Sequence, residues 1–102
     1  MAETYKTAKR RVFTIIANIP RGKVATYGQI SKIAGIPGHA RLVGRILSQL
    51  PAKTSLPWHR IVNSQGRITN PDKQRQTNKL AEEDVTLIND RINLKLYGWD
   101  PL

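Results

Sequence analysis

The chain has 102 residues, enough for one domain with a small core and too few for a catalytic domain beside a binding domain. We therefore expect residues 1–102 to form a single domain. The chain contains no cysteine, which excludes disulfides, thiolate-bound metal and a thiol nucleophile. With only two histidines, and acidic residues concentrated near the end, we expect no metal and no other cofactor.

The net charge of +10 is unevenly distributed along the chain. Residues 1–71 contain twelve Lys or Arg and one acid, whereas residues 72–102 contain five bases and six acids. A basic surface in the first two thirds is typical of a nucleic-acid-binding protein, although a generally basic soluble domain is the alternative. No apolar run approaches the ~20 residues of a spanning helix, and the first residues lack the apolar stretch of a signal peptide. We therefore expect a cytoplasmic protein, associated with the nucleoid when it binds DNA.

The first predicted helix covers about residues 4–18. Its inward positions recur at helical spacing, and they are Tyr5, Ala8, Val12, Ile15, Ile16 and Ile19. Pro20 and Gly22 then end this helix.

Two further helical patterns are separated by a short break. Thr26 and Gln29 have the spacing of a capping box, so a short helix begins there. Its inward residues are expected to be Ile30, Ile33 and Ala34, and Gly35 is placed to end it. After the break at residues 35–38, an apolar stripe predicts a second helix that ends before Pro51; the stripe is Leu42, Val43, Ile46, Leu47 and Leu50. Helix, tight turn and basic helix form the outline of a helix-turn-helix.

The region after this helix predicts a small β element. Residues 60–62 and 67–69 flank a turn containing Gly66 and predict a hairpin, which would be the wing of a winged helix-turn-helix. A polar helix is expected from residue 73 to about 82, followed by short strands at 85–88 and 92–94. Trp99 is expected to pack the tail onto the body. The predicted fold is therefore mainly α with a small β-hairpin, a winged helix-turn-helix DNA-binding domain.

A candidate functional segment is Pro57-Trp58-His59-Arg60-Ile61-Val62. In it an aromatic side chain precedes a histidine at the start of a predicted strand. A packed core tryptophan beside an ordinary histidine is the simpler interpretation. The helix-turn-helix lacks a set of Asn, Gln and Arg side chains on one face that could read bases. This favours DNA binding that does not depend on a long specific sequence.

Four motifs carry a resemblance to a known family. They are Ile19-Pro20-x-Gly22, Thr26-Tyr27-Gly28, Pro37-x-x-Ala40-Arg41-x-Val43-Gly44 and Pro57-x-His59-Arg60. In order and spacing, over roughly residues 12–66, they resemble the C-terminal DNA-binding domain of O6-alkylguanine-DNA alkyltransferases. In those repair proteins the last motif reads Pro-Cys-His-Arg, and the cysteine accepts the alkyl group. With Trp58 in that place, the chain resembles the alkyltransferase-like proteins, which bind alkylated DNA without repairing it.

The resemblance implies roles for the DNA-binding residues. Tyr27 matches the tyrosine that crowds the phosphate and helps rotate the damaged nucleotide out of the helix. Arg41 matches the arginine that inserts into the base stack, and Trp58 would line the pocket that receives the flipped base. Thr26 and Ala40 would lie on phosphates or in the minor groove, and we group Arg60 of the fourth motif with them as a DNA or lesion contact.

The resemblance also implies a histidine–carboxylate pair. The acid that orients the histidine in the family falls most naturally on Glu83, so we expect His59 and Glu83 to form a structural hydrogen-bonded pair. An indole N–H is neither nucleophilic nor readily deprotonated, so Trp58 cannot replace the cysteine in alkyl transfer. The implied function is non-enzymatic recognition of O6-alkylguanine in double-stranded DNA by a monomer, which flags the lesion for nucleotide excision repair proteins.

Two departures from the family pattern and two alternatives stay open. Leu50 stands where the transferases have an asparagine, and the opposite pocket wall falls near Asn70 and Pro71, where the register is uncertain by about two residues. The main alternative is a winged helix-turn-helix regulator that binds undamaged DNA through the major groove as a dimer. Hydrolysis by a water bound to His59, or a residual transferase or glycosylase, is the enzymatic alternative.

Overall fold

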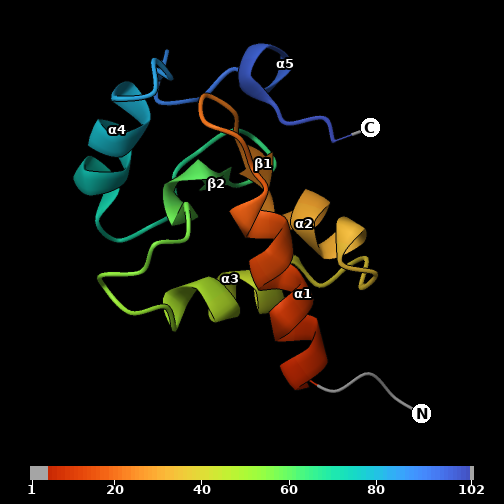
Figure 1. Ribbon diagram of the computed structural model, residues 1–102. Helices are drawn as coiled ribbons and strands as arrows, with labels where there is room; N and C mark the ends of the chain where they lie inside the picture. The colour runs from red at the N-terminus through yellow and green to blue at the C-terminus, as the bar shows by residue number, and fades with distance from the viewer. Residues whose placement is uncertain (1–4, 102) are drawn as a thin grey trace.

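The computed structural model describes residues 5–101 and is mainly helical (Figure 1). In chain order its elements are α1 (Tyr5–Ala17), β1 (Ala25–Thr26), α2 (Tyr27–Ile33), α3 (Ala40–Ser48), the 3-10 helix η1 (Trp58–Arg60), β2 (Ile61–Val62), α4 (Lys73–Ala81) and α5 (Leu94–Tyr97). In Figure 1, α1, α2 and α3 form the lower half, α4 and α5 lie above, and the two strands lie between them. The predicted start of the first helix at residue 4 lies outside the described residues.

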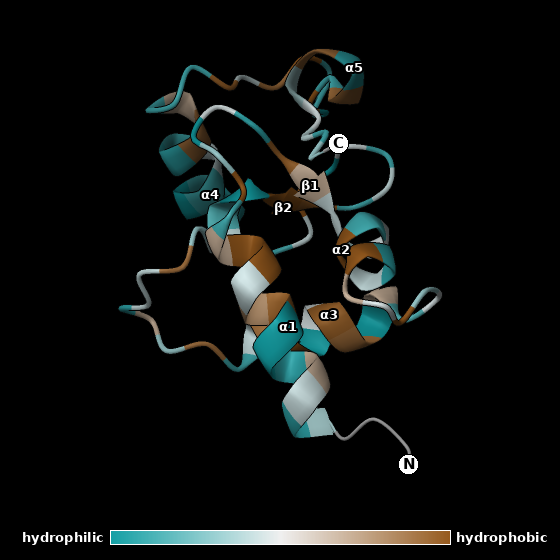
Figure 2. Cartoon of the chain, turned by 45° about the vertical axis from the view of Figure 1, so that its right-hand side comes forward, coloured by the Kyte–Doolittle hydropathy of each residue, from teal (hydrophilic) through white to brown (hydrophobic). Residues whose placement is uncertain are grey.

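The three first helices pack around one apolar core, as the sequence predicts. The core includes Val12 and Ile16 from α1, Ile30 from α2, and Val43 and Ile46 from α3, all fully buried. The helices carry both apolar and polar positions, as amphipathic helices do (Figure 2). None of the helices among residues 5–101 is long and apolar enough to cross a membrane.

Two residues predicted to face inward are exposed instead. Ile33 is 43% exposed because Ile30 and Ala34, four residues apart, form the buried stripe of the short helix α2. Tyr5 is 45% exposed at the first residue of α1, and its hydroxyl donates to Gln49 Oε1 over 2.9 Å. Both predictions were wrong at the end of a helix, where fewer neighbours surround the side chain.

The helix-turn-helix is fixed by side-chain hydrogen bonds at both ends of α2. The predicted capping box is confirmed: Thr26 Oγ1 accepts from Gln29 N over 3.0 Å, and Thr26 N donates to Gln29 Oε1 over 3.4 Å. Near the other end of α2, the buried Ser31 hydroxyl donates to the Ile36 carbonyl and accepts from His39 N over 2.9 Å, and so holds the turn before α3. The angle between α2 and α3 therefore depends on local polar contacts as well as on the core.

The predicted hairpin is wrong, because β2 pairs with a strand far away in the sequence. β1 and β2 are parallel, with Ala25 opposite Ile61 and Thr26 opposite Val62. Both residues of β2 are buried, which suits a strand covered on both faces and not the alternating pattern of a surface wing. After β2 the chain turns at Gly66, whose φ is 78°, and the Gly66 carbonyl accepts from Ile92 N over 2.9 Å.

A second apolar cluster packs the last third of the chain against Val24 and against Val62 of β2. It consists of Val24, Val62, Leu80, Val85 and Ile92. The strands predicted at 85–88 and 92–94 are wrong: only an isolated bridge joins Ile88 and Arg91, and residues 94–97 form the helix α5. Trp99 packs against the first core cluster, which confirms its predicted role.

Candidate nucleic-acid interface

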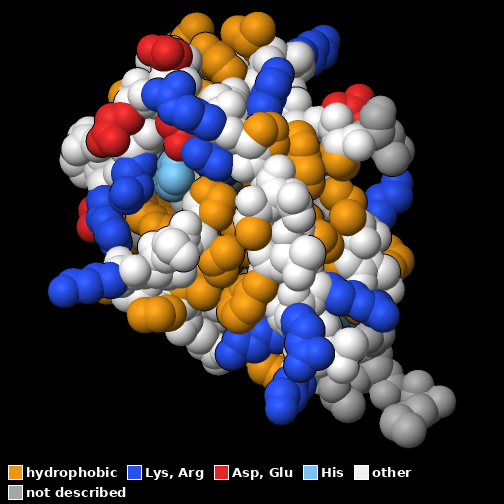
Figure 3. All heavy atoms as spheres, viewed as in Figure 1, with side chains coloured by type: hydrophobic (Ala, Val, Ile, Leu, Met, Phe, Trp, Pro, Cys, Tyr) orange, Lys and Arg blue, Asp and Glu red, His pale blue; other side chains and the backbone are white. Residues whose placement is uncertain are grey.

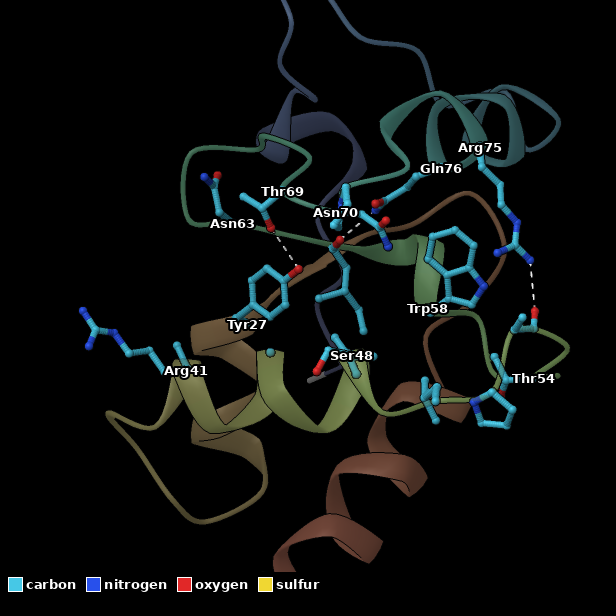
Figure 4. Close-up of a pocket in the computed structure, with 18 residues that line it drawn as sticks. Tyr27, Arg41, Ser48, Thr54, Trp58, Asn63, Thr69, Asn70, Arg75 and Gln76 are labelled. Carbon is cyan, nitrogen blue, oxygen red and sulfur yellow. Dashed lines mark hydrogen bonds between the residues drawn. The ribbon is translucent and has the colours of Figure 1, made fainter.

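A cavity of about 630 Å³ opens between the helix-turn-helix and α4 (Figure 4). Its wall comes from α3, from the connection at residues 50–54, from η1, from residues 69–71 and from the first turns of α4. Of the predicted DNA- or lesion-binding residues, Tyr27, Ala40, Arg41 and Trp58 line this cavity. Two departures from the family pattern lie there too, because Leu50 and the pair Asn70 and Pro71 are part of the wall.

Tyr27 and Arg41 lie at one end of the cavity. Tyr27 is the first residue of α2, directly after the capping residue Thr26, and its hydroxyl shares a 3.1 Å hydrogen bond with Thr69 Oγ1. Arg41 lies in the first turn of α3, is exposed, and points away from the cavity (Figure 4). The Arg41 guanidinium is thus available to an external partner, whereas Tyr27 is connected to the opposite wall.

Trp58 forms the other end of the cavity. Its indole is half-buried and meets the His59 ring edge to face, with centroids 5.9 Å apart and planes at 83°. The guanidinium carbon of Arg75 lies 4.9 Å from the Trp58 ring centroid, a cation–π contact. Sequence reasoning missed Arg75, and no motif marks it, because the contact depends on where α4 is placed.

A second group of residues surrounds the Glu83 carboxylate, and it lies outside the cavity wall. His59 Nε2 lies 2.6 Å from Glu83 Oε2, so the predicted hydrogen bond is present. Arg60 Nη2 donates to the same oxygen over 2.8 Å, and Gly22 N donates to Oε1 over 2.9 Å. Arg60 also donates to the Ile19 carbonyl over 2.7 Å. The first and fourth motifs of the sequence therefore meet at one carboxylate.

These contacts determine the protonation states of the pair. Burial would raise the pKa of Glu83, but hydrogen bonds from Arg60, Gly22 and His59 outweigh it and hold the pKa at about 2. Burial lowers the pKa of His59, and this effect exceeds the opposing effect of the hydrogen bond to Glu83. At neutral pH the pair is thus a neutral imidazole that donates Nε2–H to a carboxylate.

Arg60 has different partners from those expected of a DNA contact. Its side chain is 16% exposed, and its guanidinium donates to Glu83 and Ile19. Thr26 likewise caps α2 and does not line the cavity. Contact of Arg60 or Thr26 with DNA stays a prediction, while their structural contacts are clear.

Gln76 is a residue of the cavity wall that sequence reasoning missed. It is 2% exposed, and its Nε2 donates to the His59 carbonyl over 3.0 Å and to the Ile61 carbonyl over 2.9 Å. These bonds connect α4 to the segment that carries Trp58. Helical spacing contained the signal, because Gln76 and Leu80, four residues apart, share one face of the region predicted as a polar helix.

The charges around the cavity are positive. Two of the cavity residues are arginines and none is acidic. In Figure 3 basic side chains are spread over the visible face, and its lower part shows no acidic side chain, while most acidic side chains lie at the upper left, near α4. A positive rim beside an aromatic wall suits a polyanion that offers a ring for stacking.

Comparison with known proteins identifies the family. Residues 7–85 match the family model described as the DNA-binding domain of 6-O-methylguanine DNA methyltransferase. The chain belongs to this family. Among its relatives, a DNA base-flipping protein of Vibrio parahaemolyticus is 46% identical over 94 residues, which cover 89% of this chain and 94% of that protein.

A second relative within the family has a solved structure. Alkyltransferase-like protein 1 of Schizosaccharomyces pombe is 39% identical over 100 residues, covering 89% of this chain and 93% of that protein. The crystal structure of S. pombe Atl1 in complex with damaged DNA containing O6-carboxymethylguanine matches with a TM-score of 0.89 and 36% identity, over 99% of this chain and 100% of that chain. This match confirms the predicted fold type, apart from the hairpin.

The transferases of the family are partial matches. The methylated-DNA–protein-cysteine methyltransferase of Mycolicibacterium paratuberculosis is 36% identical over 61 residues, which cover 60% of this chain and 37% of that protein. The 102-residue sequence contains no cysteine, so it offers no thiol that could accept an alkyl group.

Proposed function

We propose that this protein recognises O6-alkylguanine in double-stranded DNA, receives the flipped nucleotide in the cavity between Tyr27 and Trp58, and leaves the alkyl group on the base. The observation that carries the proposal is the tryptophan at the cavity wall, in the motif position where transferases have their acceptor cysteine. The names of the relatives support it, since they include a base-flipping protein and a protein solved with O6-carboxymethylguanine DNA.

The cavity suits a flipped base in size and in chemistry. Its volume of about 630 Å³ falls within the ~300–1,000 Å³ of typical small-ligand pockets. Base–aromatic stacking contributes roughly 1–3 kcal/mol, so the Trp58 indole offers reversible affinity in place of a covalent bond. Flipping a nucleotide costs a few kcal/mol, and less for a poorly paired base. An alkylated guanine therefore enters the cavity at lower cost than guanine does.

Arg41 and Tyr27 are proposed to perform the flipping. Arg41 is exposed beside the cavity mouth, and its side chain would enter the minor groove and fill the space that the flipped nucleotide leaves. Tyr27 would crowd the phosphate of the rotating nucleotide, with Thr26 and Ala40 close to the backbone. These roles keep the lesion outside the stack without a chemical step.

In this proposal the protein acts only by binding the lesion, and the bound complex marks the damaged site for repair. We propose that a monomer of the protein remains on the bent DNA in the cytoplasm, associated with the nucleoid, until nucleotide excision repair proteins take over. The charge pattern supports the DNA partner, and the repair partner follows from the resemblance alone.

A titration into two matched duplexes tests the proposal. One duplex carries guanine at its centre and the other O6-methylguanine, and moderate salt limits the phosphate contribution that would mask the difference. We expect clearly tighter binding to the modified duplex, with the methyl group still on the DNA when it is recovered and analysed by mass spectrometry. Equal binding to both duplexes would refute lesion recognition and favour a regulator of undamaged DNA.

A further inference from the structure

Arg75 lies over the Trp58 ring, and both residues line the cavity. Its guanidinium carbon is 4.9 Å from the ring centroid, and its Nη2 donates to the Ala52 carbonyl over 3.1 Å. In Figure 4, Tyr27 and Arg75 lie on opposite sides of the indole. The Arg75 side chain thus contacts both the Trp58 ring and the connection at residues 50–54.

The backbone of Arg75 is fixed at the start of α4. Asp72 Oδ1 accepts from Arg75 N over 3.2 Å at the start of α4, and the next residue, Gln76, is connected to the carbonyls of His59 and Ile61. By contrast, residues 49–57 contain no regular helix or strand, and Trp58 itself begins a 3-10 helix of three residues. The indole thus contacts α4 through Arg75, while Gln76 and Glu83 hold the backbone of the same segment.

We propose that Arg75 is a positioning residue, which stacks on Trp58 and holds the indole as a preformed surface for the flipped base. The planar guanidinium stacks and donates at once, which an ammonium group on a flexible stem cannot do. A preformed wall lowers the ordering cost of binding. The inference rests on the proposed function, and it adds a residue of α4 to the determinants of lesion preference.

The competing interpretation is that Arg75 is merely an exposed base that attracts phosphate. Lys53 provides the matched control, because it is exposed, lies next to Ala52 and carries the same charge. R75M keeps the apolar stem and removes charge and donor, R75K keeps the charge, and K53Q removes a charge outside the stack. All three substitutions affect exposed residues, so we expect folded variants, checked by circular dichroism.

Two measurements test the proposal. In a W99F background Trp58 is the sole tryptophan, and quenching of its fluorescence by neutral acrylamide reports its exposure. We expect R75M and R75K to raise the quenching constant of the free protein about twofold, while K53Q leaves it unchanged. The preference for the O6-methylguanine duplex over the guanine duplex should fall about two- to fivefold in R75M and R75K, the range expected for loss of one cation–π contact.

The outcomes separate the two interpretations. If R75M weakens binding to both duplexes as K53Q does, with unchanged quenching, Arg75 is only a phosphate contact and the proposal is wrong. If R75K keeps both the quenching and the preference, the charge alone suffices and positioning by the planar stack is wrong. If the native protein binds the O6-methylguanine and guanine duplexes equally, the proposed function is wrong. The quenching measurements would still test the contact between Arg75 and Trp58.

Discussion

Replacing Glu83 with glutamine removes one buried charge while keeping the size of the side chain. In the native protein this carboxylate accepts hydrogen bonds from Arg60, His59 and the Gly22 N–H. An amide has one acceptor oxygen and an NH2 group that would face the donors of Arg60. The substitution therefore leaves a guanidinium that is only 16% exposed without its anion.

The magnitude follows from the pKa of Glu83, which lies at about 2 against an ordinary 4.5. At ~1.4 kcal/mol per pH unit, this difference corresponds to roughly 3 kcal/mol of stabilisation at neutral pH. Breaking a buried ion pair by removal of one partner costs a similar amount, about 3–5 kcal/mol. A domain of this size has a free energy of unfolding of roughly 5–15 kcal/mol, so E83Q should fold but unfold at clearly lower urea concentration.

The pH dependence gives the stricter test. Because the pKa of Glu83 is lower in the folded state, its contribution is fully present above pH 4.5 and is lost as the pH falls toward 2. The difference in unfolding free energy between the native protein and E83Q should shrink over that window. His59 acts in the same direction at higher pH: its pKa is lowered from 6.5, so protonation opposes folding as the pH falls below that value.

Urea unfolding followed by fluorescence at several pH values between 7 and 3 measures both effects. E82Q is the control, because Glu82 is the exposed neighbour and its substitution makes the same charge change. We expect E82Q to unfold like the native protein. Parallel stability curves for the native protein and E83Q from pH 5 to 3 would refute the assignment of this stabilisation to Glu83.

Three further predictions concern the cavity. Trp58→Ala should weaken binding to the O6-methylguanine duplex by about 1–3 kcal/mol, roughly 5- to 150-fold, with little change for the guanine duplex; an equal loss on both would contradict stacking. Arg41→Ala should weaken lesion binding far more than Lys53→Ala in the same titration, whereas equal losses would reduce Arg41 to a phosphate contact. Gln76→Leu should lower the free energy of unfolding by about 1–3 kcal/mol because two backbone carbonyls lose donors, and the exposed Gln74→Leu should not.

The sequence predicted those elements whose signals are local. The helical spacing of Val12, Ile16, Val43 and Ile46 places all four in the core, and the capping box at Thr26 is present. The helix α4 was also predicted, at Lys73 to about residue 82 against the observed Lys73–Ala81. These signals act within one or two helical turns, so they survive without knowledge of the tertiary structure.

The errors arose where pairing is not local. Ile61 and Val62 were assigned to a hairpin because a glycine turn follows them, but their partner strand at 25–26 precedes them by 36 residues. Asn89 and Asp90 adopt positive φ angles of 53° and 65° and close a tight turn between the two predicted strands, but only the bridge between Ile88 and Arg91 forms there. A β pattern of two residues carries too little information to choose among distant partners.

Some residues of the candidate site could also be predicted from local motifs, and others could not. Tyr27, Arg41 and Trp58 were found through motifs and line one cavity, whereas Arg75 and Gln76 come from a helix that sequence reasoning treated as plain polar surface. The contact of Arg75 with Trp58 arises only when α4 packs beside the connection at residues 50–54. Such residues become visible once the fold brings segments together.

The carboxylate cluster gives His59 and Glu83 a structural role in a chain that has no cysteine. Glu83 connects the turn at Gly22 to His59 and Arg60, and Arg60 continues to the Ile19 carbonyl. These bonds hold η1 against the end of α1, so they determine where the residue before His59, Trp58, is placed. A pair that would serve proton transfer in a transferase thus has a structural purpose that does not need the cysteine. The segment that carries Trp58 is therefore held by contacts in which no cysteine takes part.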